Sequence, residues 1–308
     1  MFADTVKLLK AAQKGNYAVG HFNINNLEIL QGVVWGAQDV KAPVIVAVSE
    51  GALSYSGLRY VVAMVEAAAK CASGPIPIAL HLDHGRNLDI ISKCINAGFS
   101  SVMFDGSHLP FEENVRMTAK VVKMAHAKGV QVEAELGTIG GAEDTVRSKN
   151  IQFTDPLLAQ EFVRRTGCDI LAVAIGTSHG AFKFSGRAKL RVDILDTIRK
   201  YVKIPLVLHG ASGVPRTMVR LAEKYGAQLQ DVEGVPDSQI RLAISKGICK
   251  INTDTDLRIA FDVGVRRAAR EHPADIDPRH MLGPAREMIR KTVAARITLF
   301  GSNGKWRG

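Results

Sequence analysis

The chain has 308 residues, of which 46% are hydrophobic and 23% charged, a composition typical of a globular protein. No apolar stretch approaches the ~20 residues of a membrane span, and the first residues lack the apolar core of a signal peptide, so we expect a cytoplasmic protein without a membrane partner. The formal net charge of +10 does not indicate nucleic-acid binding, because the basic residues are dispersed and aromatic residues do not alternate with them. A solvated basic exterior, or one that attracts anionic metabolites, accounts for the charge.

Apolar segments of strand length alternate with segments of helical periodicity along the chain. We predict strands at 17–24, 43–49, 77–83, 101–105, 130–136, 170–176, 205–209 and 248–252. Helices are predicted at 27–40, 58–72, 88–97, 110–128, 156–166, 192–201, within the stretch up to 245, and at 256–270. Eight strand–helix units favour a parallel sheet closed into a (β/α)8 TIM barrel, an α/β fold. An open doubly wound sheet is the alternative, but the first turn lacks its GxGxxG fingerprint.

Three connections exceed the usual length, at 137–154, 177–191 and 210–245. They follow the fifth, sixth and seventh predicted strands, and so lie at the end of the barrel where barrel enzymes keep their active sites. An amphipathic segment at 285–299 forms a C-terminal extension that either covers the barrel or serves a subunit interface. We therefore expect one TIM-barrel domain over 1–308, although chain length alone would also allow two.

Three of the apolar runs end in His-Gly, at His84, His179 and His209. Three neutral nitrogen ligands with one open position are the arrangement of a catalytic zinc. Strand alternation places His81 and Asp83 on one face and His84 on the other, so His84 can join such a site only if the strand has turned by Gly85. A polar His84 beside a helix-capping Asp83 is the alternative for this pair alone.

Acidic side chains end two other predicted strands. Glu133 and Glu135 share one face of their strand and are expected inside the barrel, where a carboxylate needs a cationic partner or a metal. Asp105 closes the fourth strand and could join Glu135 in a second, oxygen-rich cation site. A salt bridge to a lysine or arginine inside the barrel is the alternative, expected more for Glu133 than for Glu135.

Two loops have the composition of phosphate-binding turns. Small and hydroxyl residues follow the seventh and eighth strands, at Gly210, Ala211, Ser212 and Gly213 and at Asn252, Thr253, Asp254 and Thr255. Barrels often bind phosphate after strands 7 and 8, although each segment alone is also an ordinary turn.

Gly140 and Gly141 could act as a hinge that brings Glu143 into the site, or Glu143 lies on a solvated acidic loop. The remaining histidines are interpreted as structural or surface residues: His21, His108, His126, His272 and His280.

In this order, and over nearly the whole chain, these segments resemble the class II, zinc-dependent sugar-bisphosphate aldolases. The segment between His209 and Asn252 is similar to that of a bacterial class IIB-like subgroup of fructose-bisphosphate aldolases, and Asn-Thr-Asp-Thr-Asp at 252–256 favours the fructose enzyme. The resemblance implies a glycolytic and gluconeogenic lyase that reversibly cleaves fructose 1,6-bisphosphate into dihydroxyacetone phosphate and glyceraldehyde 3-phosphate. A tagatose-1,6-bisphosphate aldolase is the alternative, and a metal-dependent hydrolase on a barrel is a more distant one.

The resemblance also implies a role for each candidate residue. His84, His179 and His209 would hold Zn2+, and Asp105 and Glu135 a second divalent or a monovalent cation. Asp83 would exchange the proton of the C4 hydroxyl, and Glu143 the carbon-bound proton of the dihydroxyacetone phosphate half. That half would be bound by Gly180, Gly210, Ala211, Ser212, Gly213, Asn252, Thr253, Asp254 and Thr255. Ser49, and Arg279 supplied by a neighbouring subunit, would hold the second phosphate, which implies a homodimer or homotetramer.

The residues themselves, considered apart from the resemblance, are also suited to metal-dependent aldol cleavage. Cleavage of the C3–C4 bond leaves negative charge on an enediolate, which either a Schiff-base lysine or a Lewis-acid metal can stabilise. Lys250 lies on a strand face rather than at a strand tip, so the histidines favour the metal. Asp83 beside them is placed for general acid–base catalysis, typically worth ~10²–10⁴-fold.

Overall fold

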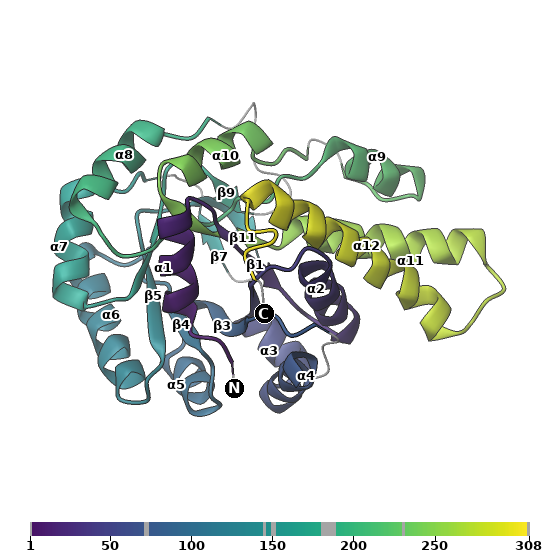
Figure 1. Ribbon diagram of the computed structural model, residues 1–308, viewed down its shortest axis with the longest axis horizontal. Helices are drawn as coiled ribbons and strands as arrows, with labels where there is room; N and C mark the ends of the chain where they lie inside the picture. The colour runs from purple at the N-terminus through teal and green to yellow at the C-terminus, as the bar shows by residue number, and fades with distance from the viewer. Residues whose placement is uncertain are drawn as a thin grey trace.

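In the computed structural model, parallel strands form a closed barrel (Figure 1). The structure describes residues 2–70, 74–143, 146–148, 152–179, 189–229 and 232–306. Around the barrel the strands follow the order β1 (Val19–Asn23), β11 (Ile248–Thr253), β10 (Leu206–Leu208), β8 (Ile170–Val173), β5 (Gln131–Leu136), β4 (Ser101–Phe104), β3 (Ile78–Gly85) and β2 (Val44–Ser49). Every predicted strand is present close to its expected position, so the predicted (β/α)8 fold is confirmed.

The strand residues alternate between two packed faces. Phe22, Val46 and Leu80 belong to the outer core, between the strands and the surrounding helices. Ile45 and Ala79, one residue away from these, belong to a second cluster inside the barrel. Because both faces are covered, the strands are almost continuously apolar, as parallel strands usually are.

Most helices follow the strands as predicted. Their bounds are α2 (Leu27–Asp39), α3 (Glu50–Ser56), α4 (Leu58–Lys70), α5 (Leu88–Asn96), α6 (Phe111–His126), α7 (Pro156–Thr166), α8 (Val192–Tyr201), α9 (Arg216–Lys224), α10 (Asp237–Ser245), α11 (Thr255–Glu271) and α12 (Pro278–Phe300). Side-chain caps fix several starts: Asn26 and Asp155 accept N–H bonds from the first turns of α2 and α7. Within the described ranges, every helix is too short or too polar to cross a lipid bilayer.

Two helices were not predicted: the short α3, and α1 (Thr5–Gly15), which lies ahead of the first strand. Asp4 caps it, and its buried Leu9 and Ala12 pack against the inner cluster of strand residues. The Thr5 hydroxyl lies 2.9 Å from the Ser101 hydroxyl at the start of β4. Helix α1 therefore closes the end of the barrel opposite the strand ends that carry the candidate site.

Two of the long loops contain a small sheet that was also not predicted. The strands β6 (Gly140–Glu143), β7 (Val146–Ser148) and β9 (Ser178–His179) form it in the order β7, β6, β9. Strand β6 is antiparallel to β7 and parallel to β9, with Gly141 paired to His179. The loops after β5 and β8 are thus joined through their backbones.

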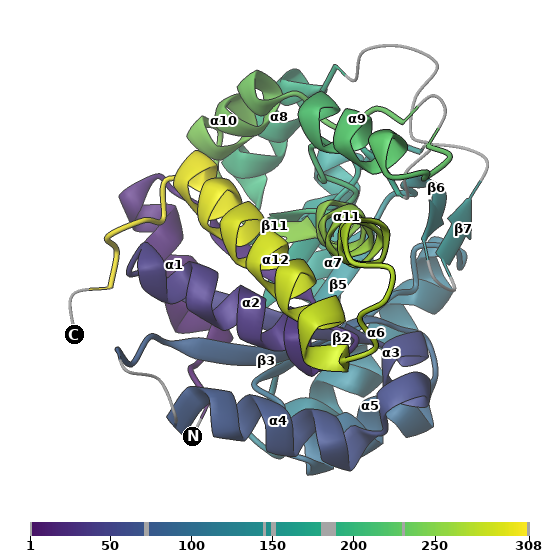
Figure 2. The same ribbon diagram turned by 90° about the vertical axis from the view of Figure 1, so that its right-hand side faces the viewer.

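The C-terminal extension is the long helix α12, which packs against α2 and α11 (Figure 2). Helices α11 and α12 extend together beyond the barrel in Figure 1. Glycines allow the close contact: a Cβ on Gly36 would lie 2.5 Å from the Arg290 carbonyl, and one on Gly264 would overlap the backbone of Ala285. The predicted amphipathic segment therefore packs on other helices over most of its length.

Gly264→Ala is expected to lower the free energy of unfolding by about 1–3 kcal/mol, the usual cost of overpacking, because α11 and α12 must separate to admit the methyl group. Urea unfolding measures the change. Gly283→Ala is the matched control, since a Cβ at this α12 position meets nothing within 4 Å. Equal loss in the two variants would contradict this account of the helix contact.

Candidate active site

His84 reaches the barrel mouth through an unusual backbone conformation. Its φ is 47°, in the left-handed region that costs a non-glycine residue ~1–3 kcal/mol, and the pairing with β4 shifts between Leu82 and Gly85. As a result, His84 Nε2 lies 4.0 Å from Asp83 Oδ1 instead of on the opposite face. The strand therefore turns as His84 requires, and it does so at His84 itself rather than at Gly85.

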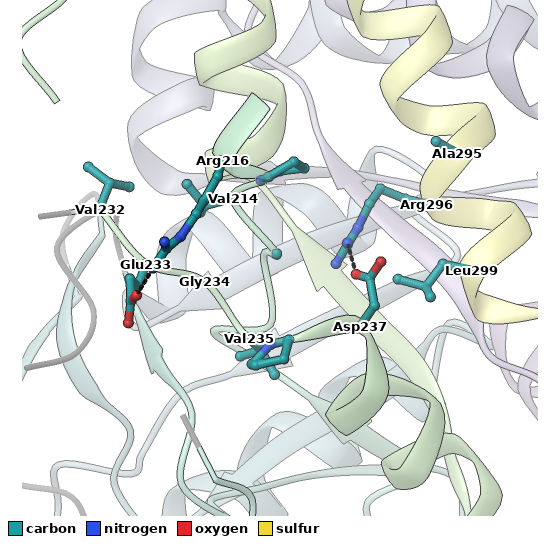
Figure 3. A pocket seen from close by; sticks show the side chains of 13 residues that line it. Val214, Arg216, Val232, Glu233, Gly234, Val235, Asp237, Ala295, Arg296 and Leu299 are labelled. Carbon is teal, nitrogen blue, oxygen red and sulfur yellow. Dashed lines mark hydrogen bonds and ion pairs between the residues drawn. The ribbon is translucent and has the colours of Figure 1, made fainter. Parts of the chain in front are cut away.

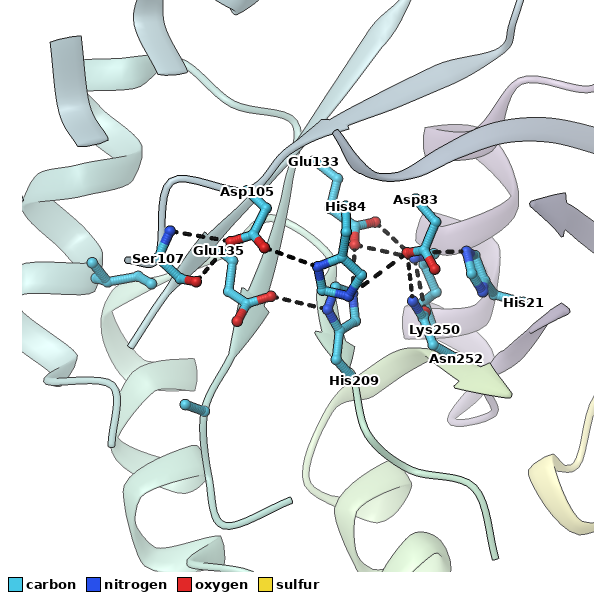
Figure 4. A network of polar contacts seen from close by, with 12 residues as sticks. His21, Asp83, His84, Asp105, Ser107, Glu133, Glu135, His209, Lys250 and Asn252 are labelled. Atoms are coloured by element: carbon cyan, nitrogen blue, oxygen red, sulfur yellow. Dashed lines mark hydrogen bonds and ion pairs between the residues drawn. The ribbon is translucent and has the colours of Figure 1, made fainter. Parts of the chain in front are cut away.

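Asp105, directly after β4, holds His84 from one side. Its Oδ2 lies 3.1 Å from His84 Nδ1, and its Oδ1 accepts a hydrogen bond from the Ser107 hydroxyl (Figure 4). The same Oδ2 lies 2.9 Å from Arg86 Nη2. Burial alone would raise the pKa of Asp105, but the hydrogen bond and charge of His84, the Arg86 charge and Ser107 lower it well below its usual value. An ionised carboxylate on one ring nitrogen orients a histidine as a metal ligand through the other nitrogen.

His209 follows β10 and contacts both glutamates of β5. Its Nδ1 lies 3.0 Å from Glu135 Oε2 and its Nε2 2.8 Å from Glu133 Oε1 (Figure 4). The His209 and His84 rings are 4.7 Å apart, edge to face. The two glutamates therefore enter the barrel together, as the strand pattern predicts.

The cation that accompanies Glu133 is Lys250 of β11. Lys250 Nζ lies 2.9 Å from Glu133 Oε2 and donates a hydrogen bond to Asn252 Oδ1 at 2.9 Å. Both charged side chains are fully buried. Burial would raise the pKa of Glu133, but the Lys250 charge and the His209 hydrogen bond bring it far below its usual value. The predicted salt bridge inside the barrel is confirmed.

Asp83 is held by two amides. Its Oδ1 accepts from Asn252 Nδ2 at 3.1 Å and its Oδ2 from Asn23 Nδ2 at 2.8 Å. Burial acts to raise the pKa of Asp83, but the nearby charges of His84, His209 and Lys250 outweigh it and lower the pKa. Asp83 is thus an oriented carboxylate at the barrel mouth, suited to accept a proton. Asn23 was not predicted as a site residue, although its position at the end of the first strand was a usable signal.

Two overlapping groups of side chains that include His84 could share a cation. They are Asp83, His84 and His209, and His84, Asp105 and Glu135, with the candidate ligand atoms of each group within 4.8 Å of one another. The pKa of His84 gives a second observation: burial would lower it, yet the surrounding carboxylates, Asp83 and Asp105 first, raise it to about 10. This point of the barrel therefore favours positive charge, and its mixed nitrogen and oxygen donors fit a divalent transition metal.

The third predicted ligand is placed by its backbone alone. His179 ends β9, and a Cβ on Gly210 would lie 2.6 Å from the Ser178 carbonyl oxygen. Strand β9 therefore runs against the chain that follows His209. The side chains of His179 and Glu143, and the whole of Gly180, lie outside the described residues, so their roles stay predictions.

The two predicted phosphate loops lie side by side. The backbone N–H of Asp254 donates to Ser212 Oγ at 3.3 Å. Thr255 begins α11, and the first turn of a helix offers backbone N–H groups to an anion. Ala211 and Thr253 are buried beside them. The contact agrees with one site built from both loops, and phosphate binding there stays a prediction.

Two residues that were not predicted, Asp256 and Arg296, contact the backbone of the loop after β10. Asp256 accepts hydrogen bonds from the N–H groups of Gly213 and Val214 at 3.1 and 2.7 Å. Arg296 of α12 donates to the Ala211 carbonyl at 3.3 Å, and its Nε lies 3.2 Å from Asp256 Oδ2. Arg296 also forms part of the wall of a cavity of about 580 Å³ behind the loop (Figure 3). The N–H of Gly213 thus serves to shape the loop.

The two residues predicted for the second phosphate lie on different parts of the chain. Ser49 caps α3, accepting from the Ala52 N–H at 3.1 Å, and lines a cavity of about 530 Å³ together with Arg258. Arg279 is exposed at the start of α12, where it pairs with Asp277. This end of α12 lies at the outer end of the two extended helices in Figure 1, a position from which a side chain can contact another subunit.

Comparison with known proteins agrees with this geometry. The family model described as fructose-bisphosphate aldolase class-II matches residues 3–305. A fructose-bisphosphate aldolase of Thermus caldophilus is 47% identical over 307 residues, which are 99% of this chain and 100% of the relative. One of Giardia intestinalis is 47% identical over 300 residues, 97% of this chain and 92% of the relative.

Solved structures give the same result. The YdjI aldolase of Escherichia coli K12 superposes with a TM-score of 0.81 at 34% identity, covering 100% of both chains. A fructose-bisphosphate aldolase of Campylobacter jejuni superposes with a TM-score of 0.76 at 25% identity, covering 97% of this chain and 94% of the other.

Lys250→Met is expected to lower the free energy of unfolding by about 3–5 kcal/mol, because Glu133 is left buried without its cation. The double variant with Glu133→Gln is expected to lose less than the sum of the single losses, and denaturant titration of all three measures the coupling. Lys246→Met is the control: its partner Asp196 is also 2.9 Å away, but the two side chains are 37% and 46% exposed, so the loss is about 1 kcal/mol or less. Additive losses at Lys250 and Glu133 would refute the coupling.

Proposed function

Since the chain belongs to the class II fructose-bisphosphate aldolase family, we propose that it reversibly cleaves fructose 1,6-bisphosphate into dihydroxyacetone phosphate and glyceraldehyde 3-phosphate, with Zn2+ as its metal. The protein is a class II aldolase, a metal-dependent lyase acting on a sugar bisphosphate. We assign the zinc to His84, His179 and His209, and a second cation to Asp105 and Glu135. All of 1–308 would form this one catalytic domain, acting in the cytoplasm.

The observation that carries the proposal is the meeting of His84, His209 and Asp83 at one end of the barrel. Their candidate ligand atoms lie within 4.8 Å of one another, although the residues come from β3 and from the turn after β10. Asp105 and Glu135 each contact one of the two rings through Nδ1. At His84 this contact fixes the tautomer and directs Nε2 towards a metal. At His209 the Nε2 atom lies 2.8 Å from Glu133 Oε1, so a metal there would replace that contact.

Cleavage of the C3–C4 bond requires a base for the C4 hydroxyl. Asp83 is the carboxylate placed for it, and Asn23 and Asn252 hold its two oxygens in position. A divalent metal, when bound, supplies Lewis-acid stabilisation of the negative charge left on the ketone-derived half. In the reverse direction Asp83 returns its proton to the new hydroxyl, and Glu143 would remove the carbon-bound proton of dihydroxyacetone phosphate.

Both phosphates need cationic or N–H partners. The loops that follow β10 and β11 would bind the dihydroxyacetone phosphate end, using Gly180, Gly210, Ala211, Ser212, Gly213, Asn252, Thr253, Asp254 and Thr255. Ser49, with Arg279 of a second subunit, would bind the other phosphate. The exposed place of Arg279 on α12 supports a homodimer or homotetramer in which the site is completed across the interface.

Removal of the metal tests the proposal directly. We expect a coupled assay to detect cleavage of fructose 1,6-bisphosphate, faster than that of the tagatose epimer, and EDTA to abolish it while the circular dichroism spectrum is kept. His84→Ala, His179→Ala and His209→Ala should each lose bound zinc, measured by elemental analysis, and cleavage with it. Full activity in EDTA, or faster cleavage of the tagatose compound, would contradict the assignment.

Asp83→Ala separates proton exchange from metal binding. The variant is expected to keep the zinc of His84, His179 and His209 but to lose ~10²–10⁴-fold in kcat, the usual contribution of a general acid–base group. Zinc content and steady-state rates measure the two effects. Asp89→Ala on the exposed start of α5 is the control and should retain both. Normal turnover in Asp83→Ala would remove Asp83 from this role.

A further inference from the structure

His21 is an ionisable residue of the barrel interior to which the proposed reaction gives no role. It lies on β1, is fully buried, and neither ring nitrogen has a hydrogen-bond partner among the described residues. A buried polar atom without a partner costs ~1–3 kcal/mol, so these nitrogens are expected to meet a group beyond the side chains that the structure describes. His21 Nε2 lies 3.7 Å from Asp83 Oδ1 (Figure 4).

His81 faces the same space from β3. It is also fully buried, and its ring centroid is 5.4 Å from that of His21, edge to face. Its Nδ1 lies 2.8 Å from the Ser101 hydroxyl, whereas its Nε2 has no hydrogen-bond partner among the described residues. One nitrogen held by a neighbour and the other open is the usual state of a metal-binding histidine.

We propose that His21, His81 and Asp83 form a further metal site, which binds a divalent ion of the zinc and cobalt class beneath the catalytic metal. Their candidate ligand atoms lie within 4.8 Å of one another. Two tetrahedral ligands of zinc lie about 3.3 Å apart, close to the 3.7 Å between His21 and Asp83. Two imidazoles and one carboxylate suit zinc or cobalt, whereas magnesium and calcium prefer oxygen alone.

Charges of both signs face this space: the carboxylates favour a cation there, and the Lys250 ammonium opposes one. Asp83 and Glu133 are two carboxylates near the group, and the ammonium of Lys250 already lies against Glu133 at 2.9 Å. His81 Nε2 is 3.8 Å from Glu133 Oε2, so a second negative charge faces the space from the other side. The ion would enter from the barrel mouth, because Asp83, at 6% exposed, is the member of the group with some solvent contact.

Occupation of this site has a consequence for catalysis, which rests on the proposed function. A metal ion that takes an oxygen of Asp83 withdraws the carboxylate that exchanges the C4 proton. The first equivalents of metal therefore activate the enzyme, and a later one inhibits it. The site would thus make excess zinc an inhibitor of the enzyme that zinc activates.

The test counts metal ions on the complete metal-depleted protein. Co2+ is titrated, bound equivalents are measured after equilibrium dialysis, and cleavage is followed in parallel. His21→Leu removes two nitrogens while filling most of the volume, and His272→Leu changes an exposed histidine in the same way. We expect His21→Leu to bind one equivalent fewer than the unchanged protein and to lose the inhibitory phase, with His272→Leu unaffected. Millimolar Mg2+ should not reproduce the inhibition.

Anomalous diffraction from zinc-soaked crystals of the unchanged protein covers the case in which His21→Leu does not fold. A peak between His21, His81 and Asp83 supports the site. Equal metal counts in the unchanged protein and His21→Leu, or a water molecule at that place in zinc-soaked crystals, would overturn it. These readouts are independent of turnover, so they can fail while the aldolase activity stands, and an inactive protein can still show the site.

Discussion

The buried negative charge at the barrel mouth is the constraint on which the rest of this structure depends. Glu133, Glu135, Asp83 and Asp105 all lie inside or at the end of a closed apolar barrel, where each carboxylate needs a compensating group. Lys250 accompanies Glu133, Arg86 accompanies Asp105, and two asparagine amides hold Asp83. These partners do not neutralise all of the buried negative charge, and His84 and His209 lie against the carboxylates that remain. The excess negative charge around the two histidines favours the binding of a metal ion.

The backbone brings His84 to these carboxylates by adopting a strained conformation at that residue. A regular β3 would send His84 away from Asp83, and the left-handed conformation at His84 brings the two together. The close approach of Gly85 to the Met103 carbonyl, 2.6 Å from where its Cβ would stand, leaves no room for a side chain at the next position. Strain of this kind commonly accompanies functional geometry in proteins.

The parts of the molecule predicted from sequence are those governed by periodicity. The apolar runs specified the barrel strands, and alternation placed Glu133 beside Glu135. A lysine or arginine partner was expected for Glu133, and the structure identifies it as Lys250. Helix α1 and the small sheet were missed, because the first is fixed by the inner cluster and the second by pairing between distant loops. His21 was taken for a structural residue, since nothing local in the sequence shows that Asp83 and His81 stand opposite it. Asp256 and Arg296 were missed for the same reason.

The hydroxyl of Thr5 is connected to the barrel interior through a series of polar contacts. It touches Ser101, Ser101 touches His81, and His81 stands 3.8 Å from Glu133, so a line of polar atoms joins the first turn of α1 to the ion pair under the mouth. Helix α1 thus closes the bottom of the barrel and also contacts, through Thr5, the polar groups inside it. A substitution that removes the Thr5 hydroxyl therefore takes away a partner of Ser101, the residue that contacts Nδ1 of the buried His81.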